Sequence, residues 1–206
     1  MLSFVIPAIN EAPSLEELRS EIAAAARATG REYEIIFIDD GSRDATWQTI
    51  VDMGAADPHV RGIRFRRNFG KAAALTAGFD ACRGDVIFTL DADLQDDPAE
   101  IPKFLSQLEA GADVISGWKK KRLDPWHKVI PSRIFNWVVG RLTGVRLHDH
   151  NCGFKCYRRE VIEEVRIHGE LHRFIPVLAA AQGFTVAEVE VHHRPRKYGA
   201  ANYGVS

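Results

Sequence analysis

The chain has 206 residues, enough for one folded domain with a substantial core, and its 27 Lys and Arg against 28 Asp and Glu give a net charge of −1. This balance gives no support to nucleic-acid binding, so any basic function depends on local clusters. The three cysteines lack a paired spacing, which supports neither a disulfide framework nor a structural zinc site and favours reduced thiols in a cytoplasmic setting.

Apolar runs of strand length alternate with helical patterns from the N-terminus to Ser116. In chain order, the expected strands are 2–9, 33–39, 60–65, 86–91 and 113–116, and the expected helices are 14–30, 44–56, 71–82 and 98–110. The first of these helices is expected to open with a capping box formed by Ser14 and Glu17. Such βαβα alternation predicts an α/β fold with a mainly parallel sheet, right-handed crossovers and flanking helices.

The regular alternation ends at Gly117. A cationic run, Lys119 to Arg122, precedes an apolar stripe at helical spacing from Lys128 to Leu142. The remaining expectations are a polar loop at 148–157, a helix at 170–182, a strand at 184–191 and a basic tail at 193–199. The stripe suits either a helix in the headgroup region of a membrane or a helix buried on the sheet. No apolar run reaches the ~18 to 20 residues of a membrane span, and no signal peptide is expected.

Two acidic pairs each follow an apolar run of strand length. Asp91 and Asp93 alternate with an alanine, whereas Asp39 and Asp40 are adjacent. A single Asp-x-Asp is more often a solvated loop than a site. Two acidic pairs at strand ends favour a site, because ligands of open α/β sheets bind at the carboxyl ends of the strands.

Carboxylates on alternate residues suit a hard divalent cation, Mg²⁺ or Mn²⁺. Such an ion usually shares its remaining coordination positions with water and substrate phosphates. The acidic pair Asp91 and Asp93 therefore predicts a metal site that binds a nucleoside diphosphate.

An ordered set of motifs resembles a known family. The motifs are Val5-Ile6-Pro7-Ala8-Ile9-Asn10-Glu11, Asp39-Asp40-Gly41-Ser42, Asn68-Phe69-Gly70-Lys71, Asp91-Ala92-Asp93-Leu94-Gln95-Asp96-Asp97-Pro98, Asn151-Cys152-Gly153-Phe154-Lys155 and Arg194-Pro195-Arg196-Lys197-Tyr198-Gly199. Together they look like the inverting family 2 glycosyltransferases, and most like the polyprenyl-phosphate glycosyltransferase branch that includes dolichyl-phosphate mannose synthase. The resemblance implies a single GT-A catalytic domain over residues 1–206, Rossmann-like in its sheet, with 119–145 as a membrane-facing or acceptor segment.

The resemblance also implies a nucleotide pocket. Its expected members are Pro7, Asn10, Glu11, Asp39, Asp40, Lys71 and Asp91. Three of them have a plain alternative. Glu11 suits a helix N-terminus, Asp40 suits a cap of the turn before Ser42, and Lys71 suits a solvated surface.

The catalytic residues implied by the resemblance are Asp93, Asp149 and Gln95. Asp91 and Asp93 are the expected metal ligands, with Asp93 the more direct one, and Gln95 is expected to face the donor sugar or the acceptor. Asp149 is expected near the acceptor.

Basic side chains are the expected phosphate and acceptor ligands, because guanidinium groups match phosphate geometry. They are Arg122, Arg133, Arg194, Arg196 and Lys197. The tail residues among them also suit a plain basic tail. The family usually continues after Tyr-Gly with a basic and a hydroxyl residue, whereas this chain has Ala200-Ala201-Asn202, so phosphate contacts beyond Lys197 are not expected.

The expected reaction is transfer of a sugar from a nucleoside diphosphate, UDP before GDP, to a polyprenyl phosphate with inversion. The enzyme is expected in the cytoplasm, peripheral at the inner face of the membrane. One alternative is a family 2 glycosyltransferase that acts on a saccharide hydroxyl. A second alternative is a nucleotide-sugar binding module without turnover. The sequence does not indicate an oligomeric state.

Overall fold

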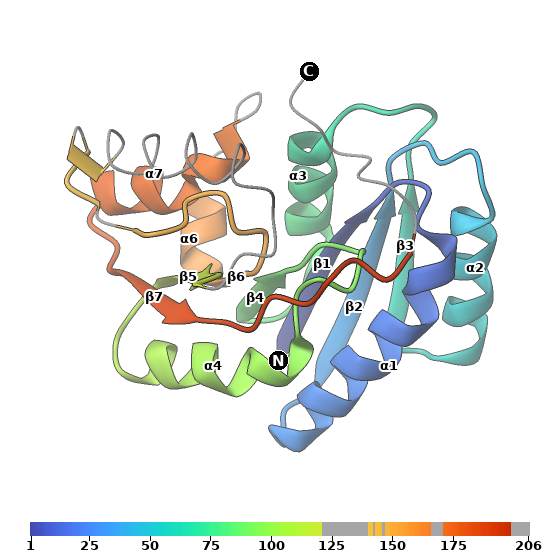
Figure 1. Cartoon of the computed structure of the whole chain (residues 1–206), viewed down its shortest axis with the longest axis horizontal. Coiled ribbons are helices and arrows are strands. Elements are labelled where there is room, and N and C mark those ends of the chain that lie inside the picture. Colours follow the sequence, from blue (N-terminus) through green and yellow to red (C-terminus); the bar gives the residue numbers. More distant parts are fainter. Residues whose placement is uncertain (121–139, 142, 146, 166–170, 199–206) are drawn as a thin grey trace.

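The computed structural model describes residues 1–120, 140–141, 143–145, 147–165 and 171–198. Within these residues the centre of the molecule is a seven-stranded sheet with the order β3-β2-β1-β4-β6-β5-β7 (Figure 1). The strands are β1 (Leu2–Ala8), β2 (Tyr33–Asp39), β3 (Val60–Arg64), β4 (Val86–Thr89), β5 (Val114–Trp118), β6 (Lys155–Arg158) and β7 (Val186–Glu190). Neighbouring strands are parallel except at β6, which runs antiparallel to both β4 and β5. The predicted α/β fold with a mainly parallel sheet is confirmed.

Helices cover both faces of the sheet (Figure 1). They are α1 (Ala12–Ala28), α2 (Thr46–Ala56), α3 (Lys71–Ala81), α4 (Ile101–Glu109), α6 (Arg159–Glu164) and α7 (Ile175–Ala181), with short 3-10 helices η1 (Pro98–Glu100) and η2 (Leu171–Phe174). The apolar sides of α1, α2 and α4 share one core with one face of the sheet. Helices α3, α6 and α7 pack on the opposite face.

Strands β1 and β2, which lie inside the sheet, are buried on both faces. Every residue of β1 and β2 is buried, which explains why their sequences are continuous apolar runs rather than alternating patterns. Within β1, Phe4 belongs to the core under α1 and its neighbour Val5 to the core under α3. The Phe4 ring stacks on Phe88 of β4 with centroids 5.2 Å apart, so the core joins β1 to the strand that carries the acidic pair.

The predicted capping box at the start of α1 is wrong. The helix begins at Ala12, with Pro13 in its first turn, where the missing N–H costs nothing. The Ser14 hydroxyl donates a 2.8 Å hydrogen bond to the carbonyl of Glu11 instead of capping the helix. Glu17 pairs with Lys197 and does not reach back to the helix start.

The predicted loop at 148–157 is also wrong in its last residues, which form β6 together with Arg158. This strand has four residues and begins and ends with a charged side chain, so it shows no alternating pattern in sequence. Its cysteine and tyrosine are fully buried between β4 and β5. The predicted helix at 170–182 divides into η2 and α7, and most of the predicted helix at 128–142 lies outside the described residues.

Parallel register brings the carboxyl ends of three strands to one edge. Ala8 of β1 pairs with Asp39 of β2, and Val5 pairs with Thr89 at the end of β4. Strands β2 and β3 lie on one side of β1 and β4 lies on the other, so the carboxyl end of β1 is a topological switch point, where α/β sheets bind ligands. In the part of the chain that the structure describes, no helix has the length and apolarity needed to cross a bilayer.

Candidate active site

The acidic pair lies in the loop that follows β4. Asp93 is 7% exposed, and its Oδ1 accepts a 3.1 Å hydrogen bond from the backbone N–H of Gln95. Between them, Leu94 has a φ of 63°, a conformation that side chains other than glycine rarely adopt. The loop is therefore held in an uncommon backbone conformation that turns Asp93 inward, and such strain is frequent at functional sites.

Asp91 forms an ion pair with Lys71 at the first turn of α3. Burial raises the pKa of the Asp91 carboxyl, but the charges of Lys71 and Lys119 outweigh it and bring that pKa to about 2. Lys71 is thus part of the acidic site rather than a solvated surface residue. Its predicted contact with the nucleotide stays a prediction.

The Asp93 carboxyl has the opposite shift. Burial and then the negative charge of Asp91 raise the pKa of Asp93 to about 6, although Arg196 and the Gln95 N–H act against them. Asp91 and Asp93 thus have pKa values below and above the ordinary value of an aspartate, and carboxyl groups with shifted pKa values are frequent at functional sites.

Arg196 bridges two parts of the site that are far apart in sequence. Its Nη2 lies 2.6 Å from Oδ2 of Asp93, and its Nη1 lies 3.0 Å from Oε1 of Glu11. Glu11 precedes the first residue of α1, yet its side chain forms no cap and faces Arg196. Glu11 thus lies at the N-cap position of α1, as the alternative of a helix N-terminal acid expects, and its side chain also pairs with Arg196.

The segment after β7 crosses the front of the sheet toward α1 (Figure 1). Arg194 binds Glu21 of α1 at 2.8 Å and Asp97 at 2.6 Å, and Lys197 binds Glu17 at 2.7 Å. These carboxylates engage two of the three predicted phosphate ligands of the tail, so Arg194 and Lys197 fasten the tail to α1 while Arg196 reaches the acidic pair.

Gln95 lies under this tail. Its backbone carbonyl accepts a 3.0 Å hydrogen bond from the Arg194 N–H, and its side-chain amide donates to the Arg194 carbonyl at 3.5 Å. The next residue, Asp96, forms a β-bridge with His193. The acidic loop and the tail are therefore one connected unit.

The loops after β1 and β2 meet beside the acidic pair. The Asn10 side-chain oxygen accepts from the Arg43 N–H at 2.8 Å, and the Asn10 N–H donates to the Ser42 hydroxyl at 2.9 Å. Asn10 has a φ of 52°, and Pro7 is buried in β1 one residue before its end. Both residues thus lie at the carboxyl edge of the sheet, as the nucleotide-pocket hypothesis requires.

The two acids at the end of β2, Asp39 as its last residue and Asp40 as the next, have different structural partners. Asp39 accepts a 2.9 Å hydrogen bond from the N–H of Ser42, so Asp39, not Asp40, caps that turn. Asp40 accepts from the N–H groups of Phe69 and Gly70, at 2.7 and 3.0 Å, and fixes the start of α3. Both carboxylates are fully buried. Their predicted contact with a nucleotide stays a prediction.

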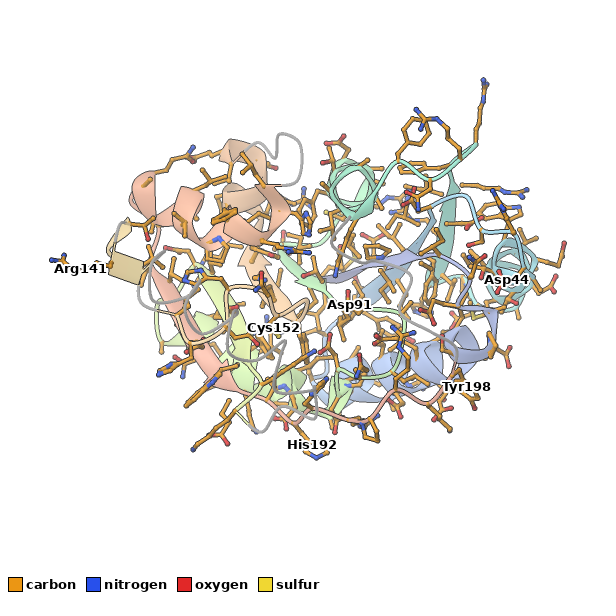
Figure 2. The ribbon with its side chains drawn as sticks, turned by 45° about the horizontal axis from the view of Figure 1, so that its top comes forward. Asp44, Asp91, Arg141, Cys152, His192 and Tyr198 are labelled. Carbon is orange, nitrogen blue, oxygen red and sulfur yellow. The ribbon has the colours of Figure 1, made fainter. Side chains whose placement is uncertain are left out.

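The loop that carries Asp149 packs against the acidic pair from the side of β6. Asp149 is 1% exposed, and its Oδ1 accepts from the Asn151 N–H at 3.1 Å. A Cβ added to Gly153 would lie 2.6 Å from Oδ2 of Asp91, so only glycine allows this loop to approach so closely. Figure 2 labels Asp91 and Cys152, the residue before Gly153, near the centre of the view.

Several residues of the site were not predicted from the sequence. Lys119 binds Asp96 at 2.7 Å, and buried Lys155 donates to the carbonyls of His150 and Cys152. His172 of η2 is 8% exposed. Burial, with the positive charges of Lys71, Arg173 and Lys155, lowers the pKa of His172 to about 4. The only sequence signal for Lys155 was its place in the motif that begins at Asn151, and His172 had none.

Two predicted acceptor ligands, Arg122 and Arg133, lie outside the described residues. Of the predicted membrane-facing segment 119–145, the structure describes 119–120, 140–141 and 143–145. The three cysteines are buried and free.

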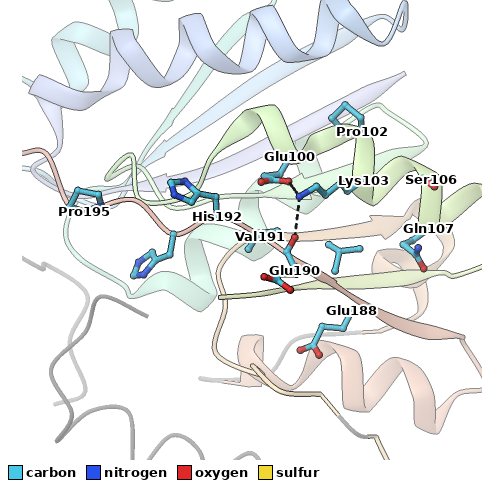
Figure 3. Close-up of a pocket in the computed structure, with 12 residues that line it drawn as sticks. Glu100, Pro102, Lys103, Ser106, Gln107, Glu188, Glu190, Val191, His192 and Pro195 are labelled. Atoms are coloured by element: carbon cyan, nitrogen blue, oxygen red, sulfur yellow. Dashed lines mark hydrogen bonds and ion pairs between the residues drawn. The ribbon is translucent and has the colours of Figure 1, made fainter. Parts of the chain in front are cut away.

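A separate groove of about 1110 Å³ lies between α4 and β7 (Figure 3). Lys103 lies in it between Glu100, with which it forms an ion pair, and the carbonyl of Glu190. None of the residues predicted for the nucleotide or the metal lines this groove.

The side chains around the acidic pair fit a divalent cation. Among the described residues no three His, Cys, Asp or Glu side chains form a metal cluster. Asp91 and Asp93 would therefore supply two hard oxygen ligands, and substrate phosphates and water would supply the rest, as is usual for Mg²⁺. In this structure Asp91 pairs with Lys71 and Asp93 with Arg196, so each carboxylate faces a positively charged side chain.

Solved structures share the fold of this chain. The chain resembles glucosyl-3-phosphoglycerate synthase from Mycobacterium tuberculosis in complex with Mn²⁺, uridine diphosphate and phosphoglyceric acid, with a TM-score of 0.74 and 20% identity over 96% of this chain and 72% of that one. The fold is that of the GT-A glycosyltransferases.

The model of glycosyl transferase family 2 matches residues 3–166, and the chain belongs to this family. It is 41% identical to the dodecaprenyl-phosphate galacturonate synthase of Rhizobium johnstonii, over 100% of this chain and 62% of the relative. It is 43% identical to the undecaprenyl-phosphate 4-deoxy-4-formamido-L-arabinose transferase of Shewanella sediminis, over 98% of this chain and 62% of the relative. The chain thus spans somewhat less than two thirds of the length of these relatives.

Proposed function

We propose that this chain is a GT-A catalytic domain that transfers a sugar from a nucleoside diphosphate to a polyprenyl phosphate with inversion. The observation that carries the proposal is the close approach of Gly153 to Asp91, which joins the loop of Asp149 to the acidic pair. A donor diphosphate bound at Asp91 and Asp93 would lie next to an acceptor bound beside Asp149. The two relatives named above act, by their names, on polyprenyl phosphates.

In this proposal the charges around the acidic pair bind and orient the donor. Asp91 and Asp93 would hold the divalent cation, which when bound would neutralise charge on the leaving diphosphate. Lys71 at the N-terminal turn of α3 and Arg196 in the tail, which pair with Asp91 and Asp93, would bind phosphate oxygens of the donor. Asp149, on the other side of Asp91, orients the acceptor for a single in-line displacement. UDP is the first choice of nucleotide and GDP the second.

A transfer assay tests the proposal. The chain is incubated with each of a panel of UDP- and GDP-sugars, Mn²⁺ or Mg²⁺, and either undecaprenyl phosphate or free saccharides. We expect a glycolipid product whose anomeric configuration is opposite to that of the donor, measured by NMR. Transfer to saccharides alone would support the hydroxyl-acceptor alternative, and binding of a UDP-sugar without any turnover would support the binding-module alternative.

The role of the acidic pair is tested with Asp93→Asn. This change removes a carboxylate from the proposed metal site while keeping its size, so the variant should fold and lose most of its transfer. Asp52→Asn in α2 is the matched control, because Asp52 is exposed and bonded only to Gln48 among the contacts described. Near wild-type turnover of Asp93→Asn with Mn²⁺ or Mg²⁺ would show that the metal assignment is wrong.

The proposed location is the cytoplasm, at the inner face of the membrane, with residues 119–145 in contact with lipid headgroups. Cationic residues near an apolar stripe suit an anionic membrane surface. Flotation with vesicles of phosphatidylcholine and phosphatidylglycerol at low salt tests this location. A chain that stays at the bottom of the gradient would contradict it.

A further inference from the structure

The loop that carries Asp149 rests on a glutamate of the edge strand β7. Oε1 of Glu188 accepts hydrogen bonds from two successive backbone N–H groups, those of His148 at 2.9 Å and Asp149 at 3.0 Å. Its Oε2 lies 2.7 Å from Nδ1 of the His148 ring. The Glu188 side chain is 12% exposed. One carboxylate therefore meets three nitrogens of the two residues where the loop enters the site.

The sheet places Glu188 at this point. In the parallel register of β5 and β7, Glu188 pairs with Ser116, whose hydroxyl donates to the backbone carbonyl of Asp149 at 3.3 Å. Two residues further along β5, the Trp118 ring stacks on the His148 ring with centroids 4.1 Å apart. The backbone of Asp149 is thus held at its N–H by Glu188 of β7 and at its carbonyl by Ser116 of β5.

These contacts lie outside the part of Asp149 that would face a substrate. Among the contacts described, Glu188 and Ser116 bind the backbone of Asp149, and its Oδ1 binds the Asn151 N–H. Hydrogen bonds to a charged acceptor are stronger than neutral ones and fix direction as well as distance. A carboxylate that receives two adjacent N–H groups fixes both the position and the tilt of the peptide that carries the Asp149 side chain.

We propose that Glu188 is a positioning residue that holds the backbone of Asp149 in its working place beside Asp91. This inference rests on the proposed function for the role of Asp149. The hydrogen bonds between Glu188 and the backbone of Asp149 do not depend on that function. Glu188 is not expected to touch substrate. Its removal should lower turnover and leave donor binding unchanged.

The strand also offers a matched control. Glu190 lies two residues along β7 on the same face, is 54% exposed, and pairs with Lys120 at the surface. Figure 3 shows both glutamates at the groove between α4 and β7, with the Glu190 carbonyl bonded to Lys103 and Glu188 apart from that pair. Glu190→Ala removes the same charge from the same strand without changing any contact of the Asp149 loop.

The first measurement is independent of activity. Hydrogen–deuterium exchange of the peptide that covers 147–153 should be faster by tenfold or more in Glu188→Ala than in the wild type. Glu188→Gln keeps an oxygen for both N–H groups, so its exchange should stay within about threefold of the wild type, and Glu190→Ala should not change it. Unchanged exchange in Glu188→Ala would overturn the proposal, even if the proposed reaction is correct.

The second measurement is kinetic. Glu188→Ala should lower kcat by ~10-fold or more, toward the ~100-fold that a misplacement of about 1 Å can cost, with the donor KM within about twofold. Glu188→Gln should recover most of the loss. In an Asp149→Asn background, Glu188→Ala should cost less than threefold more, because the positioned side chain is already gone. If Glu188→Ala lowers kcat as much in the Asp149→Asn background as in the wild type, the positioning role is overturned. If the wild type transfers no sugar, only the proposed function is overturned.

Discussion

The guanidinium of Arg196 lies 2.6 Å from Asp93, the side chain proposed as the more direct ligand of the divalent cation. The same guanidinium binds Glu11 at 3.0 Å, so one cation from the tail neutralises the acids of two loops. A divalent cation at Asp93 would compete with Arg196 for the same carboxylate oxygen. The tail and the metal are therefore expected to be coupled.

We predict that Arg196→Ala lowers the melting temperature of the metal-free protein and increases the stabilisation by Mn²⁺ alone. Removal of one partner of a largely buried ion pair typically costs ~3 to 5 kcal/mol of folding stability. The negative charge of Asp93 is then no longer neutralised by Arg196, so a bound Mn²⁺ stabilises the variant more than it stabilises the wild type. Thermal shift with and without Mn²⁺ measures both effects. Arg194→Ala is the control, since Arg194 pairs with Glu21 and Asp97 and not with Asp93. An equal or smaller Mn²⁺ shift in Arg196→Ala would contradict the competition.

Gly153→Ala is predicted to reduce transfer at least tenfold without unfolding the chain. The added methyl would lie 2.6 Å from Oδ2 of Asp91 and 2.8 Å from its Cγ, closer than non-bonded atoms approach, so the carboxylate or the loop must move. Steady-state kinetics and a melting curve measure the two effects. Gly54→Ala in α2 is the control, where the nearest atom would be at 3.3 Å. Full activity of Gly153→Ala would show that this spacing is not critical.

The stability of the chain should depend on pH through His172. Its pKa in the folded protein, about 4, lies below the ordinary value of 6.5, so the unfolded chain takes up a proton first as the pH falls. The contribution of neutral His172 is fully present above pH 6.5 and is lost between pH 6.5 and 4. The shift corresponds to about 3 kcal/mol at most.

Urea unfolding at pH 7 and pH 4.5 measures this dependence. His172→Gln should lose less stability between the two pH values than the wild type. His192→Gln is the control, because the His192 side chain is 67% exposed. The same loss in His172→Gln and the wild type would show that this histidine does not carry the dependence.

Sequence patterns predicted the parts of this molecule that local interactions determine. The central strands are continuous apolar runs, and the acidic pairs follow them directly, so both the sheet and the place of Asp91 and Asp93 could be expected. Strand β6 could not be predicted from the sequence, because its four residues have no alternating pattern and form a strand only by pairing with β4 and β5. The capping box failed for a local reason, since Pro13 already favours a helix start at Ala12.

The partners within the site depend on the tertiary fold. Arg196 and Asp93 are separated by 103 residues, and Glu188 and Asp149 by 39. Nothing in the local sequence indicates that Arg194 and Lys197 bind α1 while Arg196, between them, binds the acidic loop. The three look equivalent as phosphate ligands, and only the path of the tail across the sheet distinguishes them.

The pH dependence of Asp149→Asn should reveal the kind of acceptor. A sugar hydroxyl must lose its proton during attack, and a positioned base typically contributes ~10² to ~10⁴ in rate. A phosphate monoester has its second pKa near ~6 and is mostly dianionic at neutral pH, so it needs little help from a base. If the acceptor is a polyprenyl phosphate, Asp149 orients it, and the rate deficit of Asp149→Asn should stay nearly constant from pH 6.5 to 9. Transfer rates of both proteins across this range measure the deficit. A wild-type acid limb that is missing from the variant would identify Asp149 as a base and argue for a hydroxyl acceptor instead.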